Sequence, residues 1–377
     1  MDYSRLFKLS DDICYLNHAA VSPWPLATCE AVQRFAEENA RFGSRHYPRW
    51  LETEQRLRDQ LRDLIHATGS DEIALLKSTS EGLSVVAHGL PWQSGDNLVI
   101  PDSEFPSNRI VWESLREQGV EIRYADLATA DPEQAILALC DARTRLVSVS
   151  SVQYASGLRL DLQRLGEFCA AQDIRFCVDA IQSLGALPFD VQQVQADFVV
   201  ADGHKWLLGP EGLALFYCRT ERIPELTLHQ YGWHMVEAVG DFDRSDWRPA
   251  DSARRFECGS PNMLGIHALH ASLSVILDIG LDNIAAAIAA KIQRLTSAIQ
   301  SHADRYTLLS PTDPARRAGI LTFTTREGDN QQLFQHLQRV GIQCAERGGG
   351  IRFSPHFYTP DDCIDYALEH VAGAPTL

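Results

Sequence analysis

The chain has 377 residues and a mass of 42.0 kDa, which is long enough for two domains with hydrophobic cores of their own. Asp and Glu number 50 against 34 Lys and Arg, so the formal net charge is −16 and the pI is near 5.2. Because nucleic acids attract a basic face, this balance argues against nucleic acid as the main partner. The sequence has neither an apolar signal core near Met1 nor a stretch long enough to span a bilayer, so we expect a cytoplasmic protein without a membrane partner.

Apolar runs alternate with helical segments over roughly residues 50–250, a pattern that predicts a doubly wound α/β domain with a mainly parallel sheet. After about residue 262 the pattern becomes that of a smaller α+β domain. Its expected elements, in chain order, are an Ala-rich helix over 283–302, a strand near 319–324, a helix over 330–340, a strand near 350–353 and a helix over 361–372. We therefore divide the chain into an N-terminal arm at 1–20, a large domain at 21–262 and a small C-terminal domain at 263–377.

Nine cysteines are scattered through the chain, several of them in apolar runs such as 176–178. We expect them to be reduced thiols of the core. The sequence has no CxxC pair, no HExxH and no other cluster with metal-ligand spacing, so we expect no metal site.

Two apolar runs lead into charged residues that can do chemistry. The run 175–180 contains Asp179 near its end, and the run 196–202 is followed shortly by Lys205. In open α/β sheets ligands bind at the carboxyl ends of the strands, so both side chains are expected at one edge. There the amine can form a Schiff base with a pyridine aldehyde, while the carboxylate holds the ring nitrogen proton and keeps the ring an electron sink. The pair indicates pyridoxal 5′-phosphate (PLP) as cofactor; the plainer interpretation is a solvated loop lysine and a helix-capping aspartate.

Several motifs in a fixed order carry a resemblance to a known family. They include Tyr-Leu-Asn-His-Ala-Ala (15–20), Ala-Asp-Gly-His-Lys-Trp-Leu-Leu-Gly-Pro-Glu-Gly (201–212) and Ile-Arg-Phe-Ser-Pro-His-Phe-Tyr-Thr (351–359). Over nearly its whole length the chain resembles the class V aminotransferase group of PLP enzymes. That group includes cysteine desulfurases, selenocysteine lyases, kynureninase-like hydrolases and isopenicillin N epimerase-like proteins. The resemblance implies the fold type I of PLP-dependent transferases.

The resemblance also implies roles around the cofactor ring. Lys205 is the lysine that forms the internal aldimine, Asp179 is the partner of the ring nitrogen, and Gln182 donates a hydrogen bond to the phenolic oxygen. Gln153 is placed beside the same oxygen, and Phe105 stacks on the ring. Lys205 and Asp179 are therefore the expected catalytic residues.

The phosphate is expected at a helix N-terminus in Ser-Thr-Ser-Glu-Gly-Leu (78–83), where Thr79 and Ser80 offer hydroxyl and N–H groups. Taken alone, this stretch is an ordinary capping box. The resemblance adds His204 to the phosphate set. Asp202 stands where desulfurases commonly have a phosphate-binding serine, and we leave it out because a carboxylate repels a phosphate dianion.

The resemblance implies that Gly259 and Ser260 reach the neighbouring subunit's site, so we expect a homodimer with shared active sites. The aromatic and basic stretch 41–50 either lines the entrance across this dimer or forms an interface patch at a helix end. For the substrate, Arg352 matches the arginine that binds the α-carboxylate, and His18 and Ala20 match the N-terminal segment that lies over the substrate in this family.

Two departures bear on the reaction. Desulfurases have a histidine at the position of Phe105, and phenylalanine cannot exchange a proton. They also carry a persulfide-forming cysteine on a mobile loop, whereas no cysteine lies between Arg347 and Arg352, and Cys344 lies upstream. We therefore expect something other than a standard persulfide-relay cysteine desulfurase.

The function that follows is a PLP-dependent enzyme acting on a small amino acid through an aldimine and a quinonoid. Transamination, β-elimination by a C–S lyase and epimerisation all start from that quinonoid. Cysteine desulfurase-type sulfur transfer remains an alternative. A non-catalytic, regulatory PLP-binding protein is the alternative of another class, because a fold does not fix a reaction.

Overall fold

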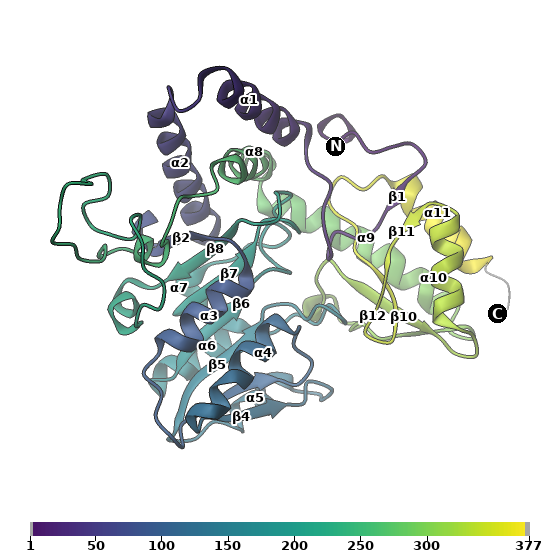
Figure 1. Ribbon diagram of the computed structural model, residues 1–377. Helices are drawn as coiled ribbons and strands as arrows, with labels where there is room; N and C mark the ends of the chain where they lie inside the picture. Colours follow the sequence, from purple (N-terminus) through teal and green to yellow (C-terminus); the bar gives the residue numbers. More distant parts are fainter. Residues whose placement is uncertain (1–2, 374–377) are drawn as a thin grey trace.

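A seven-stranded sheet forms the centre of the computed structural model, which describes residues 3–373 (Figure 1). Its order is β2-β8-β7-β6-β5-β3-β4, and β8 alone runs antiparallel to its neighbours. The strands are β2 (Ile73–Leu76), β3 (Asn97–Pro101), β4 (Glu121–Ala125), β5 (Thr144–Ser150), β6 (Arg175–Asp179), β7 (Phe198–Asp202) and β8 (Ala214–Cys218). Three of these strands, β3, β7 and β8, are buried throughout, which explains why they appear as continuous apolar runs in the sequence.

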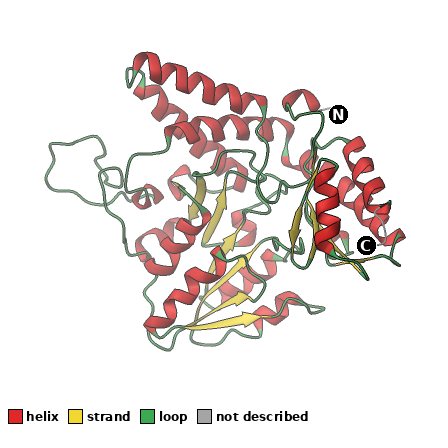
Figure 2. Cartoon of the chain, turned by 45° about the vertical axis from the view of Figure 1, so that its right-hand side comes forward, coloured by secondary structure: helices red, strands yellow, loops and turns green. Residues whose placement is uncertain are grey.

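Helices flank both faces of this sheet (Figure 2). The helices of this part of the chain are α1 (Leu26–Phe42), α2 (Tyr47–Ile65), α3 (Thr79–Gly89), α4 (Ser107–Glu113), α5 (Pro132–Leu137), α6 (Leu162–Ala171), α7 (Val191–Val194) and α8 (Met263–Ile279). Along β7, Phe198 and Val200 pack into the core under α3 and α4, whereas Val199 and Ala201 pack into the core on the opposite face. A Cβ at Gly82 in α3 would lie 2.6 Å from the side chain of Val200, so this helix lies close against the sheet.

The small unit contains an antiparallel four-stranded sheet of order β12-β13-β10-β9 and a parallel two-stranded sheet that joins the N-terminal arm to the C-terminal part. Its strands are β1 (Cys14–Tyr15), β9 (Tyr306–Leu308), β10 (Leu321–Thr325), β11 (Ile342–Gln343), β12 (Ala345–Arg347) and β13 (Gly350–Phe353). Its helices are α9 (Leu281–Ser301), α10 (Asn330–Arg339) and α11 (Asp361–Ala372). Short 3₁₀ turns complete the chain: η1 (Ser4–Leu6), η2 (Ser70–Glu72), η3 (Ser114–Gln118), η4 (Thr220–Glu225), η5 (Ala253–Phe256) and η6 (Pro314–Arg316).

The expected α/β fold with a smaller C-terminal α+β unit is confirmed. The strand at 350–353 and the helix at 361–372 match their expected bounds, and the Ala-rich helix begins at Leu281 rather than at residue 283. The division at residue 262 remains a proposal. It falls directly before α8, and α8 packs against α1 and α2, so this helix lies on the large unit although the division assigns it to the small one.

The expectation that all cysteines are reduced is wrong for two of them. Cys14 in β1 and Cys363 in α11 form a disulfide, with their Cα atoms 5.2 Å apart and 349 positions between them in sequence. Connectivity of this kind cannot be deduced from sequence, because it depends on which distant segments pack together. The bond ties the N-terminal arm to the last described helix.

Within residues 3–373, no single helix has both the length and the apolar composition needed to cross a membrane. Taken together, α8 and α9 meet those two criteria, but they meet at a bend of 82°.

Candidate active site

The carboxyl ends of β5, β6 and β7 place Asp179 and Lys205 at one edge of the large sheet. Asp179 is the last residue of β6 and pairs with Ser150 of β5 on one side and with Val200 of β7 on the other. β7 ends at Asp202, and the turn that follows carries Lys205. The acid is buried and the lysine is partly buried, so the sheet brings together the two residues that the sequence predicted to be catalytic.

Burial shifts both groups of this pair toward their neutral forms. It raises the pKa of Asp179 above the usual range, and the nearby Glu104 acts in the same direction while Lys205 opposes it. Burial lowers the pKa of Lys205; the charge of Asp179 opposes this shift, and the Arg352 guanidinium strengthens it. Shifts of this kind mark a desolvated pocket and are frequent at functional sites.

Glu104 is a buried acid beside the pocket to which the sequence analysis gave no role. It accepts the N–H of Ser150 at 2.7 Å and the side-chain amide of Gln153 at 3.0 Å. These bonds fix the segment after β3, which presents a partly exposed Phe105 to the pocket, and the Nζ of Lys205 lies 5.5 Å from the centroid of that ring. The only signal in the sequence was an acid three residues beyond a buried strand, next to Phe105.

The N-terminus of α3 is capped in two ways. The Ser78 hydroxyl accepts the N–H of Glu81 at 3.2 Å, which is half of the expected capping box. The Asp202 carboxylate accepts the N–H of Thr79 at 3.0 Å, and the Asp202 N–H donates to the Thr79 hydroxyl at 3.1 Å. Ser80 is exposed, and its hydroxyl contacts another serine hydroxyl at 2.9 Å. The helix N-terminus therefore offers Ser80 to an anion, with a carboxylate already beside it.

His204 directly precedes Lys205 in the chain, and Gln182 bonds Trp206, which directly follows it. The Nδ1 atom of His204 is buried without a hydrogen-bond partner and lies 3.8 Å from a carboxylate oxygen of Asp202. Gln182 accepts a hydrogen bond from the indole of Trp206 at 2.8 Å and donates one to the carbonyl of Ala19 at 3.0 Å. Gln182 thus links the N-terminal arm to the segment that carries Lys205.

His18 is fully buried and is held by the small unit. Its Nδ1 lies 2.8 Å from the carbonyl oxygen of Ser354, and its Nε2 lies 2.8 Å from the hydroxyl of Tyr358. Burial lowers the pKa of His18 to about 4. With both nitrogens engaged inside the chain, His18 fixes the arm, and the partly exposed Ala20 remains the member of this pair that can face a substrate.

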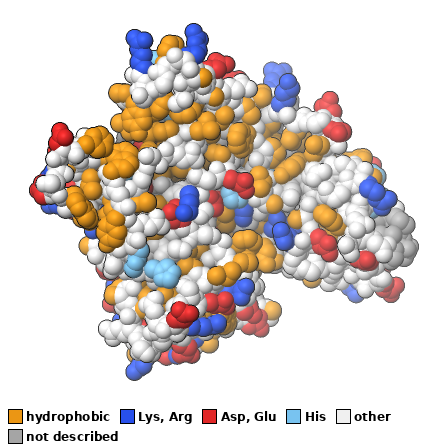
Figure 3. Space-filling view, in the orientation of Figure 1, with side chains coloured by type: hydrophobic (Ala, Val, Ile, Leu, Met, Phe, Trp, Pro, Cys, Tyr) orange, Lys and Arg blue, Asp and Glu red, His pale blue; other side chains and the backbone are white. Residues whose placement is uncertain are grey.

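Arg352 is a buried cation without a carboxylate partner among the described residues. It lies in β13, is 3 % exposed, and donates one hydrogen bond, to the carbonyl of Tyr154 at 2.8 Å. Its Nε has no partner, and burial lowers the pKa of the guanidinium to about 10, with the charge of Arg347 adding to the shift. Basic side chains are visible where the large and small units meet (Figure 3). A buried unpaired guanidinium is suited to receive an anion.

Gly259 and Ser260 lie apart from this group. No hydrogen bond, ion pair or ring contact among residues 3–373 joins them to Lys205 or Asp179. Ser260 is exposed, and a Cβ on Gly259 would meet open space. They follow η5 and come after a projecting loop over residues 227–252, seen at the left of Figure 1.

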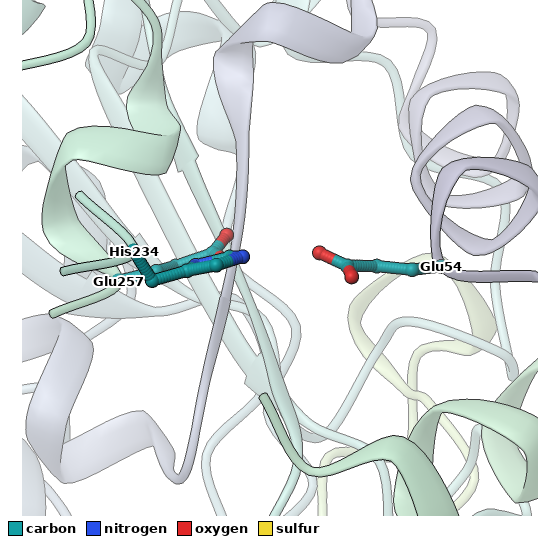
Figure 4. Close-up of side chains that lie close together, drawn as sticks. All are labelled: Glu54, His234 and Glu257. Carbon is teal, nitrogen blue, oxygen red and sulfur yellow. The ribbon is translucent and has the colours of Figure 1, made fainter. Parts of the chain in front are cut away.

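A second buried cluster holds Glu54, His234 and Glu257 (Figure 4). Arg58 neutralises both acids, with contacts of 2.5 Å to Glu54 and of 2.6 and 2.8 Å to Glu257, and the N–H of Leu75 donates to Glu257 at 2.8 Å. The positive charge that a metal would supply is therefore already present as a guanidinium. This cluster fixes the segment just before Gly259.

A family model described as Aminotransferase class-V matches residues 14–365. The chain belongs to this family. The family assignment made from the sequence motifs is thereby confirmed. Its curated class V relatives include a probable cysteine desulfurase of Methanothermobacter thermautotrophicus, 32% identical over 99% of this chain and 98% of the relative. A cysteine desulfurase of Yersinia pestis is 30% identical over 76% of this chain and 70% of its own.

Solved structures with the same class V fold share less sequence. The apo cysteine desulfurase of Thermococcus onnurineus superposes with a TM-score of 0.84 at 23% identity, covering 96% of this chain and 94% of that one. A C-DES mutant with glycine covalently linked to its PLP cofactor superposes with a TM-score of 0.88 at 22% identity, covering 96% and 97% of the two chains. These likenesses confirm the expected fold type I.

Proposed function

We propose that this class V chain is a PLP-dependent enzyme that acts on a small amino acid held by its α-carboxylate at Arg352. The observation that carries the proposal is the meeting of Asp179 and Lys205 at one sheet edge, beside a buried arginine that has no acidic partner among residues 3–373. The plainer interpretation of a solvated lysine does not fit a side chain whose pKa is lowered by burial.

The polar groups of the pocket fit this cofactor. Buried polar atoms are normally hydrogen-bonded, yet three atoms of the predicted site have no partner among the described residues: Gln153 Oε1, His204 Nδ1 and Arg352 Nε. Phe105 supplies an apolar ring face, and Ser80 supplies a hydroxyl at a helix N-terminus for the phosphate. The cofactor, when bound, supplies an electron sink for a carbanion at the substrate's α-carbon.

Each residue of the proposed site then has a defined task. The Nζ of Lys205 would hold the cofactor through its aldehyde group and would accept the proton from the substrate's α-carbon, a task that its lowered pKa favours near neutral pH. Asp179 would hold a proton at the pyridine nitrogen and Gln182 would orient the phenolic oxygen, while Thr79, bonded to Asp202, positions the start of the helix that carries Ser80. Arg352 orients the substrate through two parallel N–H donors.

The reaction that we favour is transamination or β-elimination with C–S cleavage. Relatives and structural neighbours are named cysteine desulfurases, and another neighbour is the cystine C-S lyase C-DES in complex with cysteine persulfide, which supports a sulfur-containing substrate. Against sulfur transfer through a cysteine of this chain, Cys344 is buried among residues of the small unit, and burial raises the pKa of its thiol to about 12. Its thiol lies next to the side chain of Gln338, and no cysteine is present in the β12–β13 turn.

We further propose a cytoplasmic homodimer in which Gly259 and Ser260 of one subunit complete the phosphate site of the other. Within residues 3–373, neither residue has a hydrogen bond to the Lys205 pocket of its own chain. The loop before them exposes large hydrophobic side chains, and Phe42 on α1 and Leu51 on α2 are exposed as well. Hydrophobic side chains are also visible on the surface of this part of the molecule (Figure 3). The loop residues are Tyr231, Trp233, Phe242 and Trp247.

The test is an absorbance spectrum of the purified protein, followed by L-amino acids scored for pyruvate, sulfide and pyridoxamine phosphate. Lys205→Ala is expected to abolish the lysine-bound yellow absorbance and all turnover. Lys77→Ala, which removes an exposed lysine from the surface near α3, is the matched control and should change neither. A chain that neither binds PLP nor turns over an amino acid would overturn the proposal, and PLP binding without turnover would favour the regulatory alternative.

A further inference from the structure

Arg347 and Arg352 lie on one face of the β12–β13 hairpin. Ala345 is directly opposite Arg352 in this antiparallel pair, and Arg347 is opposite Gly350. Side chains alternate along a strand, so Arg347 points to the same side as Ala345 and is the diagonal neighbour of Arg352. The intervening Glu346 points to the opposite face of the strand and is not placed to neutralise either guanidinium.

Neither arginine has an acidic partner within residues 3–373. Arg347 is exposed, whereas Arg352 is buried with an unsatisfied Nε. Arg347 is close enough to lower the pKa of Arg352 and, as a smaller contribution, that of Lys205. Two cations therefore face one pocket and lack counter-charges.

The hairpin is held firmly against the wall of the pocket. A Cβ on Gly348 would lie 2.8 Å from the Cβ of Ala155, and Gly348 has a φ of +61°, a conformation that other residues rarely adopt. The hydroxyl of Thr322 donates to the carbonyl of Ala155 at 2.5 Å. At the tip, the amide of Asn330 donates to the carbonyl of Gly349 at 2.9 Å. The position of Arg347 is thus fixed by the fold rather than by a mobile loop.

We propose that Arg347 binds a second anionic group of the substrate, so that the enzyme acts on an amino acid with an acidic side chain, a carboxylate or a sulfinate. The inference rests on the proposed function, in which Arg352 takes the α-carboxylate. One guanidinium satisfies one carboxylate through two parallel hydrogen bonds, which leaves the second cation for a second anion. Because Arg347 is exposed, it lies at the open side of the pocket, where the distal group of a substrate sits.

Kinetics with paired substrates test the assignment. Arg347→Ala is expected to lower kcat/KM about 100-fold for aspartate or cysteine sulfinate and less than about 3-fold for alanine or cysteine. Arg347→Lys keeps the charge without the planar fork and should lose about 10-fold on the acidic substrates. Arg339→Ala is the control. It removes a positive charge from α10, where the Arg339 side chain donates a hydrogen bond to a backbone carbonyl of its own helix, and it should leave kcat/KM unchanged for acidic and for neutral substrates. An equal loss on acidic and neutral substrates overturns the proposal, because it means that both arginines clamp one α-carboxylate.

Binding of unreactive acids separates this inference from the proposed function. Succinate and butyrate have the same number of carbons and differ in the second carboxylate, and neither has an amine to react with the cofactor. Calorimetry on the PLP-loaded wild-type protein should show succinate binding at least about 10-fold more tightly than butyrate, with the difference lost in Arg347→Ala. Equal affinity for the two acids overturns the substrate class even if PLP is bound. Failure to load PLP overturns the proposed function instead, and the two acids can still be compared on the cofactor-free protein.

Discussion

The Nζ of Lys205 lies 5.5 Å from the ring centroid of Phe105. The ring also meets Tyr154 edge to face, with centroids 5.2 Å apart. A phenylalanine here can stack on a cofactor ring but cannot move a proton, so we expect Lys205 to carry out proton transfer in this part of the pocket.

Replacing Phe105 by alanine removes the stacking surface and the contact with Tyr154. We expect PLP to bind about 10-fold more weakly, because aromatic contacts contribute about 0.5–1.5 kcal/mol beyond their buried area. The measurement is a titration of cofactor-free protein with PLP followed by absorbance. Ile110→Ala, at an exposed position on α4, is the control. An unchanged affinity in Phe105→Ala would remove this residue from the cofactor site.

Asp202 places a negative charge at the N-terminus of α3, where the phosphate is expected. In the wild-type chain the N–H of Thr79 donates to the Asp202 carboxylate at 3.0 Å. Asp202→Asn keeps an oxygen acceptor for this N–H and removes the negative charge. We expect PLP and inorganic phosphate to bind about 10-fold more tightly, because a repulsion between like charges is lost. Equilibrium titration with each ligand measures this. Weaker binding in the variant would instead mean that the carboxylate supports the phosphate site, for example by orienting His204.

The lowered pKa of Lys205 predicts a pH dependence for cofactor loading. A lowered pKa means that the amine is neutral, and therefore nucleophilic, at a pH where an ordinary lysine with a pKa of about 10.4 is still charged. The rate of PLP incorporation into cofactor-free protein should rise with pH, with a midpoint below that value. Asp179→Ala removes a nearby negative charge and should move the midpoint down, whereas Arg352→Ala removes a positive charge and should move it up. Stopped-flow absorbance at a series of pH values gives the midpoints; shifts in the reverse directions would contradict the proposed electrostatics.

Arg58 neutralises two buried acids, so its removal should be costly. Arg58→Ala leaves Glu54 and Glu257 buried without their cation, and we expect a loss of about 3–5 kcal/mol in the free energy of unfolding. Arg34→Ala breaks an exposed i,i+4 pair on α1 and should change it by less than about 0.5 kcal/mol. Denaturant unfolding of the two variants checks the difference. Similar stability of both would show that the buried cluster does not hold the segment before Gly259.

Local sequence patterns were sufficient for the architecture and for the centre of the site. The continuous apolar runs identified β6 and β7, because strands buried on both faces have no polar side. Once these runs are taken as parallel neighbours, the positions of Asp179 and Lys205 at one edge follow from the fold class alone. The order of the motifs indicated the family.

Tertiary structure decided the features that depend on distant segments. Cys14 and Cys363 are 349 positions apart, and only the packing of β1 near α11 brings their sulfurs together. His18 matched a motif that was expected to face the substrate, yet both of its ring nitrogens form hydrogen bonds with residues of the small unit, Ser354 and Tyr358. The sequence by itself thus determined the fold class, the family and the pairing of Lys205 with Asp179, because strand ends and motifs are local. Burial, strand register and side-chain facing, which put Arg347 beside Arg352, were decided by long-range packing.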